Sequence, residues 1–286
     1  MTMQHMRLET GRDGIAVLTL DRGDRTENVI DDGWLNDLDR ALDRIGADES
    51  LNGLMVVSAK ERSLTAPDLT MPGQEVRSMS PVQGFEISQR VSGLFRRIEL
   101  LPIPVVAVIE GAALGVGLEL ALACDHRIVA DDPGARIGFP DVNLGRITGA
   151  GGSQRLPRMI GVPAALDILL TGNTMDGTHA LELGLVDEIA SMASLVAAAR
   201  HWLSTATKTA KPWDRKGFAP PESRGLLLPE VAATYSLAAA GVAARTGYDN
   251  PAPIALLSAV FEGMQLPFDR ALQIESKYFG KVIANT

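Results

Sequence analysis

The chain has 286 residues, 46% of them hydrophobic and 22% charged, a balance typical of a soluble globular protein with a sizeable core. Its formal net charge of −8 argues against nucleic acid as the main partner. No apolar run reaches the roughly 18 residues that a membrane helix needs, and the first residues lack the apolar core of a signal peptide. We therefore expect a cytoplasmic protein with no membrane span.

The first elements alternate between strand and helix patterns. Residues 14–21 (GIAVLTLD) and 53–59 (GLMVVSA) are short apolar runs that predict strands. Between them, residues 31–46 have the spacing of an amphipathic helix, which we expect to end at Gly46. Trp34 lies on this helix and is expected in the core.

The alternation continues through the middle of the chain. Residues 87–102 have helical spacing, which the prolines at 102 and 104 stop. A strand is predicted at 105–111, then a helix starting near residue 116, then short strands at 126–132 and 135–141 around a Pro-Gly turn. Strands and helices in this order predict an α/β core with a largely parallel sheet.

Beyond about residue 190 the sequence becomes rich in alanine and in helical spacing. Residues 211–225 interrupt it with a high density of proline, glycine and charge, which predicts an exposed loop. Residues 253–283 predict two amphipathic helices broken near Pro267, whose apolar faces need a partner surface.

The sequence offers little for metal or disulfide chemistry. Its only cysteine, Cys124, cannot form an internal disulfide and is expected to be a small buried hydrophobe. No CxxC, HExxH or P-loop string occurs and the four histidines are scattered, so no metal site is expected. His126 is expected to be structural.

A single carboxylate, Glu119, stands inside the apolar helix predicted near residue 116. A helix that is apolar all round is buried, and an unpaired buried carboxylate has a raised pKa that suits a general acid or base. Glycines at 111, 115 and 117 allow close approach to the backbone, and the helix N-terminus offers N–H groups to an anion. These residues alone leave two interpretations open: an acid/base site, or a close-packed turn with Glu119 bonded to a neighbouring loop.

Four longer segments occur in order and at matching spacings. They are SAKERSLTAPDL (58–69), IPVVAVIEGAALGVGLELALACDHRIVADD (103–132), IGFPDVNLGRITGAGGSQRLPRMIG (137–161) and LTGNTMDGTHALELGLVDEI (170–189). Together they resemble the crotonase family, the enoyl-CoA hydratases and isomerases, over nearly the whole chain. Residues 253–283 resemble the linker helix of fused fatty-acid β-oxidation enzymes, and the chain is most similar to their hydratase half.

The resemblance implies a fold and a substrate class. The fold would be α/β, with a crotonase-like ββα spiral core over residues 1–195 and a helical C-terminal region over 196–286 that resembles the fused-enzyme linker. The substrate would be an acyl-CoA thioester, so that coenzyme A belongs to the substrate and no separate cofactor is needed. The resemblance also allows a homotrimer.

Site residues follow by position. Glu119 falls where the family has its first catalytic carboxylate, and Asp141 on the second, where hydratases usually have Glu. Val116, after Gly115, lies where a glycine N–H normally supplies half of the oxyanion hole. The shorter Asp141 side chain withdraws the carboxylate by on the order of 1.5 Å, and a displacement of about 1 Å can cost 10²-fold in rate.

The other half of the oxyanion hole falls on Pro67, between Ala66 and Asp68, where the family usually has alanine. Proline has no N–H to donate, although it is favoured at the first position of a helix, where that N–H would go unpaired. Lys60 and Arg62 precede this loop and are candidates for contact with the CoA phosphates, or else belong to a solvated charged edge.

The expected reaction is hydration of a 2-enoyl-CoA through an oxyanion-stabilised enolate, slow or specialised because Pro67 removes one donor. Two alternatives stay open. One is a Δ3,Δ2-enoyl-CoA isomerase or another thioester reaction of the family, such as hydrolysis. The other is a catalytically weak acyl-CoA binding protein.

Overall fold

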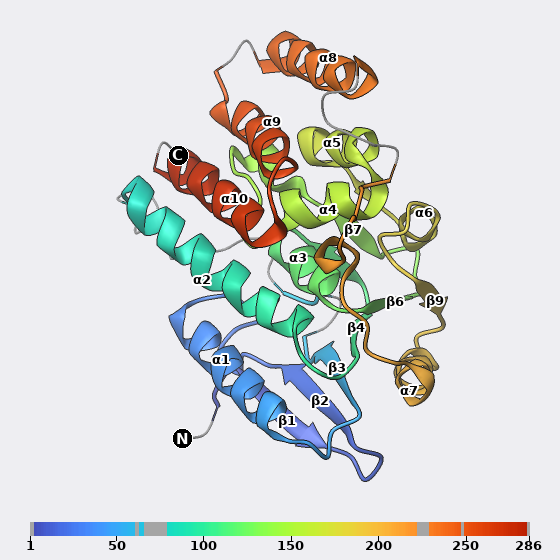
Figure 1. Ribbon diagram of the computed structural model, residues 1–286. Helices are drawn as coiled ribbons and strands as arrows, with labels where there is room; N and C mark the ends of the chain where they lie inside the picture. The colour runs from blue at the N-terminus through green and yellow to red at the C-terminus, as the bar shows by residue number, and fades with distance from the viewer. Residues whose placement is uncertain (1–2, 61–62, 66–78, 222–228, 247–248, 285–286) are drawn as a thin grey trace. The chain divides into compact units, whose positions relative to one another are not determined.

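The computed structural model describes residues 3–60, 63–65, 79–221, 229–246 and 249–284 (Figure 1). The chain groups into two compact units. Unit 1 comprises Met1–Thr70, Leu94–Ile137 and Met175–Ala210, and unit 2 comprises Met71–Gly93, Gly138–Thr174 and Lys211–Thr286. None of the boundaries between these units lies at residue 195. The predicted division into a core over residues 1–195 and a helical C-terminal region over 196–286 stays a prediction.

Unit 1 is built on a six-stranded sheet with the order β1-β2-β3-β4-β6-β9. Its strands are β1 (Met6–Thr10), β2 (Ile15–Leu20), β3 (Gly53–Ser58), β4 (Val105–Ile109), β6 (His126–Ala130) and β9 (Glu188–Ala190). β1 and β2 pair antiparallel, and every other neighbouring pair is parallel. The predicted largely parallel sheet is confirmed. It has an added strand at each edge, β1 and β9.

One face of this sheet is covered by α7 (Leu195–Thr205). Strand residues alternate between faces, so Ile15, Met55 and Val106 point together toward this helix. Leu195, Ala199 and Leu203, spaced by four residues on the helix, complete the cluster. Unit 1 also contains α6 (Gly177–Glu182), beside β9.

The predicted amphipathic helix is α1 (Asp32–Ala47), capped at its start by the side chain of Asp31. Trp34 on its inner face is fully buried, as predicted. The predicted end at Gly46 is wrong: Gly46 lies within the helix and does not adopt a left-handed backbone. The helix instead ends at the next residue, where the N–H of Asp48 bonds to the Ile45 carbonyl.

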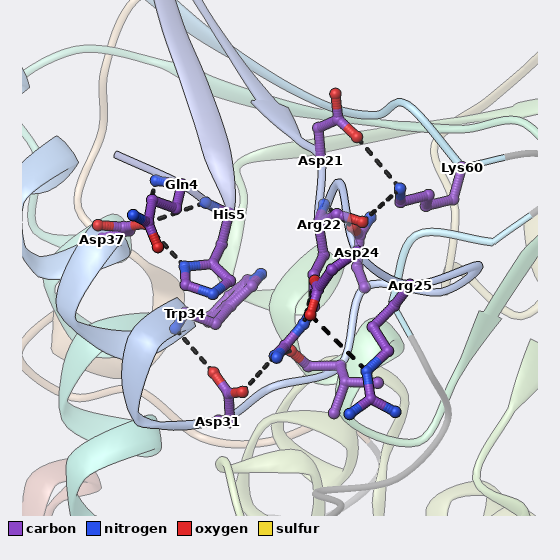
Figure 2. Close-up of polar contacts among 12 residues, drawn as sticks. Gln4, His5, Asp21, Arg22, Asp24, Arg25, Asp31, Trp34, Asp37 and Lys60 are labelled. Carbon is purple, nitrogen blue, oxygen red and sulfur yellow. Dashed lines mark hydrogen bonds and ion pairs between the residues drawn. The ribbon is translucent and has the colours of Figure 1, made fainter. Parts of the chain in front are cut away.

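Side chains tie the start of the chain to α1 (Figure 2). The Asp37 carboxylate accepts hydrogen bonds from the backbone N–H groups of Gln4 and His5, and the His5 ring lies 2.9 Å from it. On the other side of Trp34, Arg22 forms an ion pair with Asp31. These contacts hold β1 against the helix that follows β2.

A second sheet has the order β5-β7-β8, with β5 (Ala112–Leu114), β7 (Arg136–Gly138) and β8 (Thr174–Met175). The chain enters α3 (Val116–Ala123) directly from β5. Helix α2 (Pro81–Glu99) begins earlier than the predicted residue 87, with proline in its first turn, and ends before Pro102 as predicted. Its residues 81–93 belong to unit 2.

Unit 2 is helical. It contains η2 (Pro140–Leu144), α4 (Gly152–Ile160), α5 (Val162–Thr171), η3 (Pro212–Asp214), α8 (Pro229–Thr246), α9 (Pro251–Gly263) and α10 (Phe268–Ile283). In Figure 1, α9 and α10 lie side by side, and both contact α4. The break predicted near Pro267 is confirmed, because this proline precedes the first residue of α10.

The C-terminal helices bury most of the apolar residues predicted to need a partner. Leu256, Val260, Leu272 and Phe279 are buried within unit 2. Phe261 is instead exposed on one side and makes an edge-to-face contact with Tyr235 of α8, their ring centroids 5.0 Å apart. The tail thus packs on helices of its own chain.

Backbone contact joins the first half of α2 to α10. A Cβ atom added to Gly84 would lie 2.8 Å from the Cα of Gly280, and one added to Gly280 would lie 2.2 Å from the carbonyl oxygen of Pro81. Only glycine permits this approach. One turn further along, the hydroxyls of Ser88 and Ser276 are 2.7 Å apart.

Candidate active site

The first candidate group is the start of α3. Gly115 precedes the helix with φ +50°, a backbone conformation that favours glycine. All eight residues of α3 are buried, and Glu119 is 1% exposed. The prediction of a buried apolar helix that carries a buried carboxylate is therefore confirmed.

Gly117 allows another segment to reach this helix. Ser63 forms a bridge with Ala112 of β5, and the Leu64 N–H bonds to the Ala112 carbonyl at 3.0 Å. A Cβ atom on Gly117 would then lie 2.8 Å from the Thr65 hydroxyl. The predicted oxyanion residues that follow Thr65 lie outside the described residues, and these are Ala66, Pro67 and Asp68.

The Val116 N–H belongs to the first turn of α3, where backbone N–H groups have no acceptor inside the helix. Within the described part of the chain, no other group accepts a hydrogen bond from it. The predicted donor is thus present in unit 1, three residues before Glu119. It has the chemistry to hold developing negative charge on a carbonyl oxygen.

The second carboxylate, Asp141, lies in unit 2 on η2. The turn that follows is fixed by two hydrogen bonds to the Asp141 carbonyl, from the N–H groups of Gly145 and Arg146. Its side-chain Oδ2 is buried and has no hydrogen-bond partner among the described residues. Burial, with a further contribution from the charge of Glu275, raises the pKa of Asp141 to about 7. At neutral pH this group can therefore both give and take a proton.

Glu275 on α10 is a buried carboxylate that the sequence analysis missed. It is fully buried and accepts hydrogen bonds from the Thr148 hydroxyl (2.9 Å), the Gly151 N–H (2.5 Å), and the N–H and hydroxyl of Ser153 (2.8 and 2.5 Å). The sequence did contain a signal for its burial, because Glu275 is spaced by three and four residues from Leu272 and Phe279 on the apolar side of its helix.

Glu275 therefore fills the N-terminus of α4. The glycine-rich sequence GAGGS, which opens this helix, resembles a loop that could bind an anion. Its free N–H groups instead point at a carboxylate of the same chain. The start of α4 is a structural feature of unit 2.

The candidates for CoA phosphate binding are placed differently from one another. Lys60 donates to the Arg22 carbonyl at 2.6 Å and forms an ion pair with Asp21 at 3.1 Å (Figure 2). Its ammonium is thus held at the end of β2. Arg62 lies outside the described residues. Contact of either residue with a phosphate stays a prediction.

Two further residues that the sequence analysis considered, Cys124 and His126, lie in packed parts of the structure. Cys124 is fully buried, as predicted. His126 stacks on Trp202 with ring centroids 4.5 Å apart, and burial lowers its pKa. Among the described residues, no group of His, Cys, Asp and Glu side chains is arranged to hold a metal ion. The helices described include none that is long and apolar enough to span a bilayer.

Comparison with solved structures defines the class of fold. The chain superposes on the enoyl-CoA hydratase from Bacillus anthracis with a TM-score of 0.64 and 26% identity, covering 98% of this chain and 91% of that one. An enoyl-CoA hydratase from Shewanella pealeana superposes with the same TM-score over 71% of this chain and 74% of that one, at 24% identity. The fold is the crotonase fold, as predicted.

Sequence comparison assigns the family. The family model for enoyl-CoA hydratase/isomerase matches residues 10–213. The fatty acid oxidation complex subunit alpha of Shewanella sp. (strain MR-4) is 34% identical over 96% of this chain, and that of Shewanella amazonensis is 34% identical over 95%. The chain belongs to the enoyl-CoA hydratase/isomerase family, a family of enzymes. It spans 38% of the length of these two relatives.

Proposed function

We propose that the protein hydrates 2-enoyl-CoA thioesters, with Glu119 and Asp141 as acid and base and the Val116 N–H as an oxyanion donor. The observation that carries this proposal is the uncapped start of α3 at Val116 with a buried carboxylate one turn later. Family membership supports the same chemistry, because crotonase-family enzymes act on acyl-CoA thioesters.

The residue types fit the steps of the reaction. A base takes a proton from water, the hydroxyl adds at the β-carbon, and the electron pair moves onto the thioester oxygen as an enolate. A backbone N–H aimed at that oxygen is typically worth about 10²–10³ in rate. An acid then protonates the α-carbon. Asp141, whose pKa is raised to about 7, suits the acid, and Glu119 suits the base.

A second candidate is an acyl-CoA binding protein with weak or no turnover. Pro67 favours it, because proline cannot donate the second hydrogen bond of the oxyanion hole. Loss of one such donor typically costs about 2.7–4 kcal/mol of transition-state stabilisation. This candidate predicts tight binding of CoA esters without product.

The test is a panel of saturated, 2-enoyl and 3-enoyl-CoA substrates, with products followed by chromatography and mass. Hydration adds the mass of one water to the 2-enoyl-CoA. Conversion of 3-enoyl to 2-enoyl-CoA without a mass change would identify an isomerase, and release of free CoA a thioesterase. Binding without any product would identify the weak binder.

Coenzyme A is part of the proposed substrate, so the proposed reaction needs no additional cofactor. A cytoplasmic location and a homotrimer remain predictions for this chain. Sedimentation of the purified protein at several concentrations tests the second of these.

A further inference from the structure

Glu275 and Asp141 are connected through a short stretch of unit 2. Glu275 holds the Thr148 hydroxyl, the Gly151 N–H and both polar groups of Ser153. The turn that carries Asp141 closes at Arg146, whose N–H bonds to the Asp141 carbonyl at 3.0 Å. Only Ile147 separates Arg146 from the first residue that Glu275 holds. The loop held at Thr148 is therefore separated from the Asp141 turn by a single residue.

The surroundings of Glu275 hold its carboxylate in a fixed position. A buried carboxylate is stabilised by several N–H and O–H donors and by the positive end of a helix dipole, and Glu275 has both at the start of α4. Hydrogen bonds to an ionised group are shorter and stronger than those between neutral groups. The loop is thus held more firmly than neutral contacts would hold it.

The same carboxylate acts on Asp141 through space. Among the charged groups of the described chain, Glu275 is the one whose charge raises the pKa of Asp141, in addition to burial. Like charges close together disfavour the ionised form. The two buried cations of α4 both donate to backbone carbonyls, Arg155 to Ala150 at 2.6 Å and Arg158 to Gly263 at 2.9 Å.

We propose that Glu275 is a positioning residue for Asp141: the C-terminal helix α10 fixes, through this one carboxylate, the loop and turn that carry the acid of the reaction. The catalytic part of this inference rests on the proposed function. The structural part, that Glu275 sets the turn and the surroundings of Asp141, does not.

The main test is Glu275→Gln, which keeps the side-chain size but removes the charge and places an NH₂ group against either the Gly151 donor or the Ser153 donors. We expect kcat on 2-enoyl-CoA to fall by roughly tenfold or more with KM within about twofold. We also expect the Asp141 carboxyl, followed by carbon-13 NMR, to titrate lower by roughly one pH unit. Asp269→Asn removes a carboxylate from the exposed side of α10 and should change neither.

A folded Glu275→Gln protein with wild-type kcat and an unshifted Asp141 titration would overturn the inference. If the wild type does not turn over any acyl-CoA, the proposed function fails, but the Asp141 titration still decides whether Glu275 sets its surroundings. A loss of thermal stability without any change in that titration would mean that Glu275 has only a structural role.

Should Glu275→Gln not fold, Ser153→Ala gives an independent test. It removes one hydroxyl donor to Glu275 and leaves the charge in place. We expect faster hydrogen exchange at the Arg146 amide, which closes the Asp141 turn, and a loss in kcat of roughly threefold or more. Unchanged exchange at Arg146 would contradict the inference without any reference to activity.

Discussion

Two helices of this protein each follow a glycine with positive φ, but the N–H groups at their N-termini have different partners. Helix α3 follows Gly115 and helix α4 follows Gly151, and both glycines have positive φ. At α3 the Val116 N–H has no acceptor among the described residues. At α4 the N–H groups of Gly151 and Ser153, on either side of the first helical residue, bind the Glu275 carboxylate. The local sequence does not distinguish these cases, because the group that fills α4 lies 122 residues from Ser153.

The difference shows which of the two helix N-termini can stabilise charge on a substrate. An N-terminus that already holds a carboxylate has its positive potential neutralised, whereas an open one can stabilise charge that develops during a reaction. Four experiments test this difference and the site that it defines.

The largest effect should come from removing Glu275 together with the C-terminal helices that pack on α4. Deletion of residues 250–286 removes α9 and α10, exposes the apolar side of α4 and leaves its N-terminus without Glu275. We expect aggregation, or a fall in Tm of more than about 10 °C in calorimetry. A soluble and equally stable truncation that still binds acyl-CoA would show that the tail is dispensable for both.

The next effect concerns the open start of α3. Glu119→Gln keeps the shape of the buried side chain but removes its proton chemistry, so turnover should fall by about 10² or more while CoA-ester binding is retained. Steady-state kinetics and calorimetric binding measure the two separately. Glu182→Gln, on the exposed side of α6, is the matched control. Near-full turnover by the Glu119 variant would make this carboxylate structural.

A smaller gain is expected from Pro67→Ala. If the open N–H at Val116 is one half of the oxyanion hole, restoring an N–H at residue 67 should raise crotonyl-CoA hydration by roughly tenfold or more, mainly in kcat. Pro133→Ala, in an exposed turn, controls for loss of a proline elsewhere. A fast wild-type hydratase that the Pro67 variant leaves unchanged would mean that another group completes the hole.

The smallest effect is in stability. The pKa of Asp141 is about 7 in the folded protein, against 3.8 for an unperturbed aspartate, so between these pH values the folded state binds a proton that the unfolded state has released. The free energy of unfolding therefore falls as pH rises from 4 to 7. Asp141→Asn removes this dependence, so the variant should gain stability over the wild type at pH 8 relative to pH 6 by about 1–2 kcal/mol.

Urea unfolding of both proteins at the two pH values measures this difference. Asp167→Asn, a second carboxylate of unit 2 on the exposed side of α5, should leave the pH dependence of the wild type unchanged. Parallel pH profiles for wild type and the Asp141 variant would show that this carboxyl titrates normally.

Much of unit 1 could be predicted because its elements carry their own signal. The apolar run of β4 and the all-apolar surface of α3 each specify burial without reference to other elements. Strand β1 escaped prediction because Met6 is its only buried residue, so the apolar alternation is too weak. Gly46 misled because a glycine ends a helix only where the backbone turns left-handed, and here it does not.

The candidate site was predictable only in part, for a related reason. Burial of Glu119 follows from its neighbours on one helix, whereas the raised pKa of Asp141 comes from its burial in the folded chain, with a further contribution from Glu275, which is distant in sequence. Its position among Leu272 and Phe279 indicated that Glu275 is buried, but the groups it binds could be known only from the folded chain.

The large sequence separation between Glu275 and the groups that it binds also affects folding during synthesis. The last residue of unit 1 is Ala210, so every strand of its sheet has been synthesised by then. The donors at Gly151 and Ser153 must wait for Glu275, up to 124 residues later, which at about 5–20 residues per second is roughly 6–25 s of translation. During that interval the N–H groups of Gly151 and Ser153 lack the carboxylate that accepts their hydrogen bonds in the folded chain. Substitutions in α10 should therefore lower the yield of native protein in the cell more than the yield when the 286-residue chain is refolded from denaturant.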